Sequence, residues 1–517
     1  MVNLEKTFRD SVARAERELE SICISKIHDL GISKTHIDLL GSHTVVTYPP
    51  LDSLIPLDGN NVFEKLAFQP EVDAYLHVPF CEYPCKFCPY TTLNLDGKNV
   101  QGMPSYFDML NVEIGTWTYK LKKNNSKIRS LYLGGGTPFA LPLNQLEDLL
   151  FFIKETLPFA DSPEICVETS PKATLETDAR RKLEILQKYG VNRISIGVQS
   201  FDFESLRDMA RTFRGHDTQD EEKAVRILLN SGISNINVDM IQDLPLGSKT
   251  YLERLKFDLK KIASLMPQHV TWYNMRLRPE VTYTKIPKNI VNERESLLTR
   301  LTIWNFMESI GYKVQEGDRF VLEEKYEDTF RKTRGSVITD LLGIGVSAYS
   351  HVYPLFFQNP RVTGGAVRTD SKIATKTYVD AVKKNGHAIT TGYFLSDDEL
   401  LAGKFALGLK KKVDLKDVEE FLLGRPIAAT YNDLILSRET KLVDAGLLEV
   451  SSDMKLGFTR TGRLFENEIC ARFYTPRSIY LAHAKRGTLT IEIIKNCTDY
   501  ESAILMRNVM DEQRFVA

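Results

Sequence analysis

The feature that most constrains the fold is a regular alternation of short apolar runs and amphipathic segments between residues 73 and 283. Amphipathic, helix-like segments cover Met103–Leu121, Leu143–Thr156, Thr177–Tyr189, Asp220–Ser231 and Thr250–Ser264. They separate six apolar runs typical of strands: Ala74–Val78, Ser130–Leu133, Glu164–Glu168, Arg193–Val198, Asn235–Ile241 and His269–Asn274. This alternation is typical of βα units and a parallel sheet. Six units are too few for a closed eight-unit barrel, so we predict an α/β fold with a partial (β/α)6 barrel.

The flanking sequence divides the chain further. We expect an N-terminal helical or lid segment over residues 1–70, with a helix at Phe8–Ile27, and the barrel over 71–290. A helical, irregular connection with a glycine-rich turn is expected over 291–390, and a C-terminal α+β domain over 391–478. Residues 479–517 form a tail without an assignment.

The expected C-terminal domain has the pattern of a winged helix. Its predicted elements are three helices and a two-stranded hairpin: Asp397–Leu409, Leu415–Leu422, Tyr431–Asp444, Leu447–Val450 and Leu456–Thr459. A lid or packing role is favoured over nucleic-acid binding, because Lys410–Lys412 is the one basic run of this unit.

Composition excludes several classes of protein. Lys and Arg total 67 against 68 for Asp and Glu, which gives a net charge of −1 and argues against a nucleic-acid binder. No apolar run approaches the ~20 residues of a membrane span, and the charged opening segment has no apolar leader region. We therefore expect a cytoplasmic protein with no membrane partner. Seven cysteines, an odd number in a long chain, do not suggest a disulfide framework.

Three of the seven cysteines, Cys81, Cys85 and Cys88, lie within eight residues of one another. They follow the first predicted strand, on a loop that contains Pro79 and Pro84. Thiolates bind iron–sulfur clusters or zinc, and structural zinc normally takes four protein ligands. A zinc site completed by a distant ligand is the alternative. Three ligands with no fourth nearby favour an iron–sulfur cubane with one open iron.

This CxxxCxxC loop resembles the radical S-adenosylmethionine (SAM) superfamily. Five segments narrow the resemblance to the oxygen-independent coproporphyrinogen III oxidase-like branch, and they occur in family order: Tyr75–Cys81 (YLHVPFC), Leu133–Pro138 (LGGGTP), Ser195–Phe201 (SIGVQSF), Asn237–Pro245 (NVDMIQDLP) and Leu342–Ser350 (LGIGVSAYS). The resemblance implies a [4Fe-4S] cluster held by the three cysteines. It also implies that the open iron is chelated by SAM, which one electron cleaves to a 5′-deoxyadenosyl radical.

The resemblance also implies roles for individual residues. Tyr75 would pack beside the cluster. Arg211 would bind the SAM carboxylate, and Arg214 is a competitor for that role. Asp239 would belong to the site, because a charge inside an apolar strand needs a function or a partner. A surface salt bridge is the alternative for either arginine, and a buried structural pair is the alternative for Asp239. The remaining implied SAM contacts are Gly134, Gly135, Gly136, Thr137, Glu168, Gln199, Met275 and Arg276.

The sequence departs from the porphyrinogen oxidases in ways that bear on the substrate. Those enzymes carry a further cysteine just after the third ligand, whereas Cys88 is followed by Pro89 and Tyr90. Their N-terminal Arg-Tyr-Thr-Ser-Tyr-Pro-Thr signature is also missing. The Pro49-Pro50 segment and His216 suit methyltransferase, cyclopropanase and haem-handling relatives better.

We therefore expect an enzyme that uses one or two SAM molecules, the second as methyl or methylene donor to an unsaturated or aromatic small molecule. Oxidative decarboxylation of coproporphyrinogen, or anaerobic haem processing, is the first alternative. A non-catalytic haem-binding chaperone is the second. Loop position makes Tyr90, Tyr349 and Arg278 candidates for substrate contact. The expected electron donor is a flavodoxin or ferredoxin, and a monomer is expected.

Overall fold

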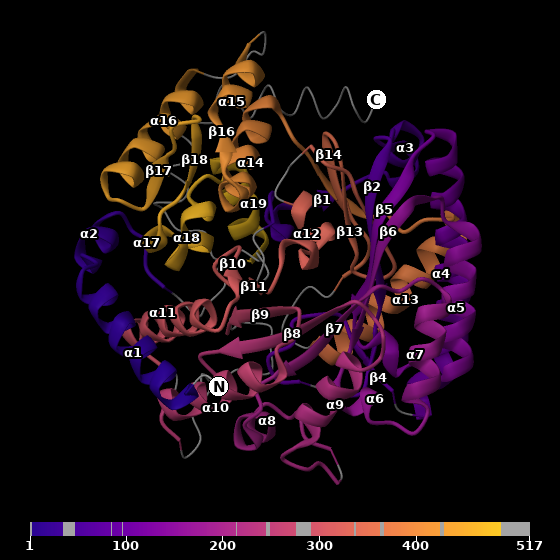
Figure 1. Cartoon of the computed structure of the whole chain (residues 1–517). Coiled ribbons are helices and arrows are strands. Elements are labelled where there is room, and N and C mark those ends of the chain that lie inside the picture. The colour runs from indigo at the N-terminus through magenta and orange to yellow at the C-terminus, as the bar shows by residue number, and fades with distance from the viewer. Residues whose placement is uncertain are drawn as a thin grey trace.

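The computed structural model describes residues 3–34, 47–83, 85–95, 97–213, 215–244, 249–275, 291–334, 338–361, 367–423 and 429–486. Its core is a sheet in which six consecutive strands run parallel (Figure 1). These strands are β2 (Glu71–Val78), β5 (Lys127–Gly135), β6 (Phe159–Thr169), β7 (Arg193–Gln199), β8 (Asn235–Gln242) and β9 (His269–Asn274). Within the described residues the sheet does not close on itself. The predicted α/β class with a partial barrel of six units is confirmed.

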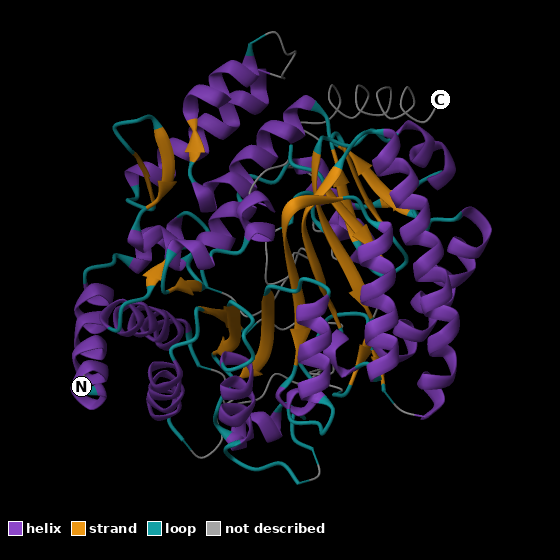
Figure 2. Ribbon diagram, turned by 45° about the vertical axis from the view of Figure 1, so that its right-hand side comes forward, coloured by secondary structure: helices purple, strands orange, loops and turns teal. Residues whose placement is uncertain are grey.

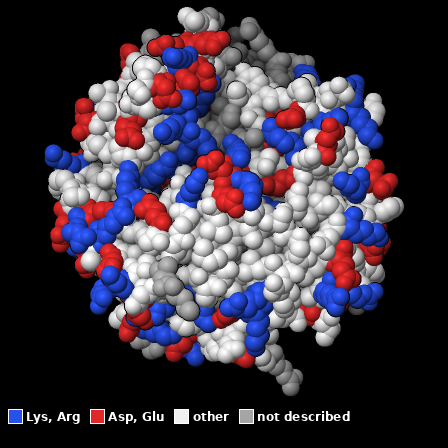
Figure 3. All heavy atoms as spheres, in the orientation of Figure 1, with Lys and Arg blue, Asp and Glu red and all other residues white. Residues whose placement is uncertain are grey.

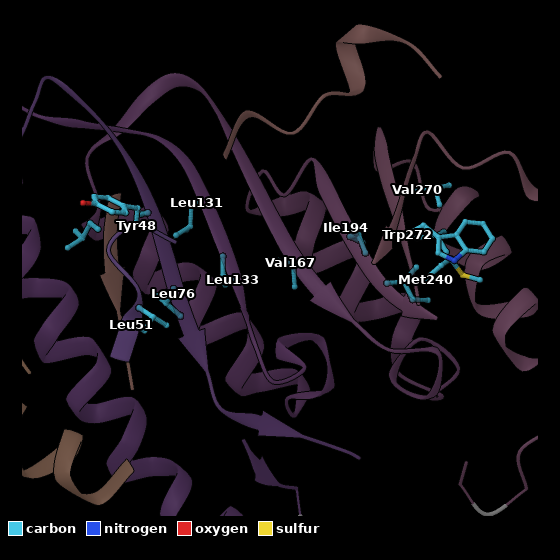
Figure 4. Close-up of a cluster of buried hydrophobic side chains, with 14 of the residues drawn as sticks. Tyr48, Leu51, Leu76, Leu131, Leu133, Val167, Ile194, Met240, Val270 and Trp272 are labelled. Carbon is cyan, nitrogen blue, oxygen red and sulfur yellow. The ribbon is translucent and has the colours of Figure 1, made fainter. Parts of the chain in front are cut away.

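Helices cover one face of this sheet (Figure 2). The principal ones are α4 (Gly97–Lys123), α5 (Leu143–Thr156), α7 (Ala179–Lys188), α9 (Asp220–Leu229) and α10 (Tyr251–Leu265). The strands meet them with buried apolar side chains, including Leu133, Val167, Ile194, Met240 and Val270 (Figure 4). Successive side chains of a strand point to opposite faces, so the residues between these apolar ones face the interior of the partial barrel.

The sheet extends beyond the six parallel strands at both edges, to thirteen strands in all among the described residues. Beside β2 lies β12 (Leu341–Ile344), a seventh parallel strand. It is followed by the antiparallel strands β13 (Tyr349–Val352), β14 (Leu355–Gln358), β15 (Thr391–Phe394) and β1 (Ile55–Pro56). Beside β9 lie β11 (Arg319–Val321) and β10 (Lys313–Val314). The expectation of a helical, irregular stretch over 291–390 is therefore wrong in part. These strands have two to four residues each, too few to show a period-two pattern.

The same stretch does contain three helices, α11 (Glu293–Ser309), α12 (Thr329–Arg334) and α13 (Val367–Asn385). At the N-terminus the single helix expected at Phe8–Ile27 is two helices, α1 (Leu4–Glu20) and α2 (Ile24–Asp29). The break follows Ser21, whose hydroxyl donates to the Glu18 carbonyl and whose backbone caps α1. α1 packs along α11 (Figure 1).

The C-terminal unit has the predicted winged-helix-like arrangement. Three helices, α14 (Asp397–Gly408), α15 (Leu415–Leu422) and α16 (Ala429–Asp444), precede the hairpin of β17 (Leu448–Val450) and β18 (Lys455–Phe458). A third strand, β16 (Val413–Asp414), was missed because it has only two residues. The chain continues through α17 (Arg460–Leu464), α18 (Glu466–Ala471) and α19 (Pro476–Arg486).

The last described helix packs against the segment around residue 50. Helix α19 packs against the short helix η1 (Leu51–Ser53). Just before α19, the Tyr474 hydroxyl donates to the Thr47 carbonyl at 2.7 Å, and its ring lies 5.5 Å from that of Tyr48. No helix among the described residues is long and apolar enough to cross a membrane.

Glu113 on α4 is fully buried and connects the added strands to the helical layer. Its carboxylate accepts hydrogen bonds from the Gly345 backbone N–H at 2.8 Å, the Tyr378 hydroxyl at 2.7 Å and the Asn359 amide at 2.9 Å. Gly345 has a φ of +96°, so its turn after β12 needs a glycine, and Glu113 satisfies the N–H of that turn.

Replacement of Glu113 by alanine should therefore destabilise the protein by about 3 kcal/mol, because it leaves several buried donors without an acceptor. Urea unfolding would measure the loss, with Asp108→Ala, at an exposed position of the same helix, as the control. Equal unfolding free energies for the two variants would contradict this account of the turn.

Candidate active site

The three clustered cysteines lie at the carboxyl end of β2. Cys81 ends the short strand β3 (Phe80–Cys81), which pairs with β4 (Leu93–Asn94), and all three half-buried thiols line one chamber, here called the cysteine chamber. Burial raises the pKa of both Cys81 and Cys88, and the neighbouring Cys85 thiol raises them further. Thiolates held this close together need a cationic partner, and an iron–sulfur cluster supplies one.

Among the described residues, no three His, Cys, Asp or Glu side chains converge as the ligands of one metal ion would. An iron–sulfur cubane does not need the three thiolates to meet at one point, because each thiolate binds a different iron. The three cysteines fit such a cluster because thiolates are its usual ligands and all three line the same chamber.

The glycine turn after β5 lies directly beside the cysteines. A Cβ atom on Gly136 would come within 2.3 Å of the Phe80 carbonyl oxygen, and one on Gly135, whose φ is +102°, within 2.4 Å of the His77 ring. Thr137, the next residue, places its hydroxyl 3.3 Å from the Cys81 sulfur. Only glycine lets the backbone of this turn come so close to Phe80 and His77. The backbone of Gly135 and Gly136 therefore lines the chamber directly.

Arg211 reaches the cysteines from the loop after α8 (Phe203–Asp208). Its Nη1 donates to the Cys85 sulfur at 3.3 Å, its Nη2 donates to the Gly197 carbonyl, and its guanidinium lies 5.1 Å from the centre of the Tyr83 ring. Arg211 is buried in the wall of the cysteine chamber. It is therefore not a surface salt bridge, and a buried guanidinium at this position suits a carboxylate.

Glu168 and Asp239 project into the same chamber from β6 and β8, the two strands on either side of β7. The Tyr132 hydroxyl and the Gly135 N–H donate to the Glu168 carboxylate at 2.9 and 3.0 Å. Burial, followed by repulsion from Asp239, raises the pKa of Glu168 to about 7. The Glu168 carboxylate lines both chambers, which lie in the interior of the partial barrel.

Asp239 has neutral partners. Ser195 and Asn237 donate to its two oxygens at 2.7 and 2.8 Å, and burial raises its pKa. A buried carboxylate with hydroxyl and amide partners that lines a chamber favours a site role over a structural ion pair.

The structure places the other residues expected at the site in different surroundings. Gln199, with a φ of +72°, and Met275 line the cysteine chamber, and Met275 packs with Phe87 of the cysteine loop. His216 instead stacks on the Phe213 ring at 4.4 Å and contacts Glu221, so it is turned away from the chamber. Arg214, Arg276 and Arg278 lie outside the described residues.

Tyr75, which was expected to pack beside the cluster, lines a second chamber that adjoins the cysteine chamber. Tyr75 and His77 alternate on β2 and both face the interior, and the Tyr75 hydroxyl lies 3.0 Å from His77 Nδ1. His77 Nε2 lies 2.9 Å from the Thr91 carbonyl, which can only accept, so we assign the proton to Nε2. Burial lowers the pKa of His77 to about 4, which keeps the ring neutral.

The second chamber, here called the arginine chamber, extends along the interior of the partial barrel. It shares part of its wall with the cysteine chamber, at Pro89, Tyr90, Gly135, Glu168, Ser195 and Tyr273. Tyr349 lines the arginine chamber, as expected for a substrate-side residue. The chamber also carries arginines and tyrosines that were not predicted for the site: Arg193, Arg319, Arg331, Arg361 and Tyr132.

A signal for these missed residues is present in the strands themselves. In β7 the residues Arg193, Ser195, Gly197 and Gln199 alternate with buried isoleucine and valine, and in β8 Asn235, Asn237 and Asp239 do the same. A polar residue at every second position of a buried parallel strand indicates a polar interior.

The comparisons with known proteins agree with this geometry. The profile of the Radical SAM superfamily matches residues 75–245. The haem chaperone HemW of Bacillus subtilis is 25% identical over 410 residues, which cover 77% of this chain and 98% of that protein. The oxygen-independent coproporphyrinogen III oxidase of Salmonella typhimurium is 27% identical over 445 residues, 81% of this chain and 90% of that enzyme. The solved structure of coproporphyrinogen III oxidase (HemN) from Escherichia coli shares the fold, with a TM-score of 0.68 and 24% identity over 85% of this chain and all of that one.

A cysteine loop after the first parallel strand, with the glycine turn of the next strand beside it, is the arrangement of a radical SAM protein, and residues 75–245 of the chain form a Radical SAM domain. Its cofactors are a [4Fe-4S] cluster and SAM. Over most of its length the chain is similar in sequence to the HemW proteins and the oxygen-independent coproporphyrinogen III oxidases.

The cysteine assignment predicts a selective loss of the cluster. Cys81→Ala, Cys85→Ala and Cys88→Ala should each remove most of the iron and the visible absorbance of anaerobically reconstituted protein. Cys470→Ala is the matched control, since this buried thiol lies in α18 of the C-terminal unit. Full iron loading of any of the first three variants would contradict the ligand set.

Glu168 makes stability depend on pH. Because its folded pKa of about 7 exceeds the ordinary value of 4.5, its contribution is complete below 4.5 and is lost as the pH rises through 7. Between about pH 5 and about pH 8 the wild type should lose about 3 kcal/mol of unfolding free energy relative to Glu168→Gln. Urea titrations without SAM measure this difference, with exposed Glu155→Gln as the control. Parallel pH profiles for wild type and Glu168→Gln would disprove the prediction.

Proposed function

We propose that this chain is a radical SAM enzyme that takes a hydrogen atom from a carboxylate-bearing tetrapyrrole. The observation that carries the proposal is the wall shared by the two chambers. Glu168, Ser195 and Tyr273 face both the chamber with the cysteines and the chamber with the arginines. A substrate in the arginine chamber therefore lies next to SAM bound in the cysteine chamber.

The residues of the cysteine chamber have distinct roles in this proposal. When bound, the cluster and SAM supply the electron and the 5′-deoxyadenosyl radical. The glycine turn at Gly134–Gly136 presents backbone groups to the methionine ammonium, and Arg211 binds its carboxylate. Glu168 accepts a hydrogen bond from SAM, Gln199 and Asp239 line the pocket, and Met275 packs against the adenosine.

The arginine chamber supports the choice of substrate class. Four arginines line it together with Tyr75, Tyr132, Tyr273 and Tyr349. Guanidinium groups suit carboxylates, and tyrosine rings suit the aromatic pyrrole rings of a tetrapyrrole. Haem and coproporphyrinogen, the compounds in the names of the relatives, are tetrapyrroles with carboxylate side chains. Loss of CO2 from such a side chain and anaerobic processing of haem both fit this chamber.

Transfer of carbon from a second SAM, the reaction expected first from the sequence, draws no support from the relatives named above. They are haem chaperones and coproporphyrinogen oxidases. A second candidate function is haem binding without turnover. The match to HemW over 98% of that protein favours it.

Product analysis separates these functions. Reconstituted protein, reduced anaerobically and given SAM with coproporphyrinogen III or haem, should form 5′-deoxyadenosine and a modified tetrapyrrole, measured by mass spectrometry. Glu168→Gln should keep its cluster but bind SAM about tenfold or more weakly, because a charge-assisted hydrogen bond is lost. Cys85→Ala should form no 5′-deoxyadenosine, and Cys470→Ala should behave as the wild type.

Other outcomes select the alternatives. S-adenosylhomocysteine formed together with 5′-deoxyadenosine would favour carbon transfer. Stoichiometric haem binding by a fully loaded protein that forms no 5′-deoxyadenosine would replace the enzyme proposal by the chaperone function.

A further inference from the structure

The arginine chamber ends at three arginines that come from three different elements. Arg193 begins β7, Arg319 begins β11 and Arg331 lies in α12. We propose that these three guanidinium groups form an anion subsite, which takes a carboxylate of the substrate remote from the reacting carbon. The inference rests on the proposed function and adds a second binding point at the end of the chamber away from the cysteines.

Two of these arginines are buried with unused donors. Arg193 is 1% exposed and Arg319 is 4% exposed. The Nε of each has no hydrogen-bond partner among the described residues. Arg193 uses its other nitrogens, with Nη2 2.6 Å from His269 Nδ1 and Nη1 donating to the Tyr326 carbonyl at 3.3 Å. A buried charged donor without an acceptor is costly, and a bound carboxylate would remove this cost.

The acidic neighbours do not satisfy the two guanidinium groups. Asp328 is shared between them, with its Oδ2 3.9 Å from a terminal nitrogen of each. Glu316 and Asp318 lie 3.5 and 3.7 Å from Arg319 Nε. Charge-assisted hydrogen bonds are shorter, about 2.7–2.9 Å. These contacts therefore hold the arginines in place but leave their donors available.

Two of the acidic groups near the arginines have shorter contacts with other partners. Glu164 accepts from the backbone N–H groups of Thr329 and Phe330, at 3.0 and 3.4 Å, at the start of α12. Glu316 forms its short contact, 2.8 Å, with Lys411. His269 is neutral, since burial and the neighbouring Arg193 lower its pKa. The three arginines and Asp328 line this part of the chamber, so its lining has a net positive charge.

Strand register gives the distance to the reactive end. Arg193 precedes Ser195 by two residues on β7, and Ser195 donates to Asp239 and pairs with Glu168. At about 3.3 Å per residue, the Cα atom of Arg193 lies about 7 Å along β7 from that of Ser195. Gln199, at the far end of β7, is about 20 Å away by the same measure. A rigid substrate with carboxylates on opposite edges would reach both ends, whereas a single short acid would not.

A purely structural role for the arginines is the alternative, and the test is chosen to exclude it. The probes are coproporphyrin III, which carries four carboxylates, and its tetramethyl ester, which carries none. Binding of both to anaerobically reconstituted protein with SAM is followed by fluorescence. The first variant is Arg331→Gln, at a half-buried position. The second is Arg193→Lys, which keeps the positive charge but loses the planar guanidinium group that can bind a carboxylate with two hydrogen bonds. Arg226→Gln, at an exposed position, is the matched control.

We expect Arg331→Gln and Arg193→Lys to weaken binding of the acid by about ten- to a hundredfold and to leave binding of the ester unchanged. Arg226→Gln should change neither. The iron content of each reconstituted variant is measured beside the wild type, which shows whether the variant folds and holds its cluster.

Two outcomes overturn the inference, and they can be told apart. If the wild type binds the acid and turns over a tetrapyrrole, but both variants bind acid and ester as the wild type does, the subsite is wrong and the proposed function stands. If the wild type binds neither probe, the tetrapyrrole function fails, and the subsite fails with it.

Discussion

The structure depends on strands that have two different faces. Along β7 and β8 the apolar residues, such as Ile194, Ile196 and Val238, meet the helical layer, while Arg193, Ser195 and Asp239 face inward. The outward face supplies the hydrophobic stabilisation that holds the sheet and helices together. Burying the polar side chains of the inward face in a packed apolar core would cost free energy. Here they line chambers in which polar ligands could bind. The partial barrel is thus a binding cavity rather than a packed core.

The cysteine chamber and the arginine chamber differ in the parts of the fold that line them. The cysteine chamber is built from loops at the carboxyl ends of the strands, where the glycine turn, Arg211 and the thiols meet. The arginine chamber is lined mainly by strand residues, together with α12 and loop residues such as Tyr90 and Arg361. Loops allow close approach of a cofactor, and strands place charges at fixed spacing. Under the proposed function, SAM would therefore be held mainly by loops and the substrate mainly by strands of the same cavity.

Much of this arrangement was predictable from the sequence, because long periodic segments and a dense cysteine motif carry strong signals. The six parallel strands, the cysteine chamber and the winged-helix-like unit followed from such segments. Strands such as β10 and β16 were missed because two residues cannot show a period. The sequence places Tyr75 on the inward face of β2, but which of two adjoining chambers it lines depends on the tertiary fold. Arg319 and Arg331 could not be connected with Arg193, since only the tertiary fold brings them together.

The order of strands in the sheet has a consequence for how the protein matures. The six parallel strands end at Asn274, yet β2 is flanked by β12, from residues 341–344, and the outermost strand β1 near the N-terminus pairs with β15 at residues 391–394. During synthesis the chain leaves the ribosome N-terminus first, and pairing across such long separations is slow. β12 can pair with β2, and β15 with β1, only after the whole stretch of chain between them has been synthesised. The strands that flank β2 therefore join the sheet after the loop that carries the cysteines has left the ribosome.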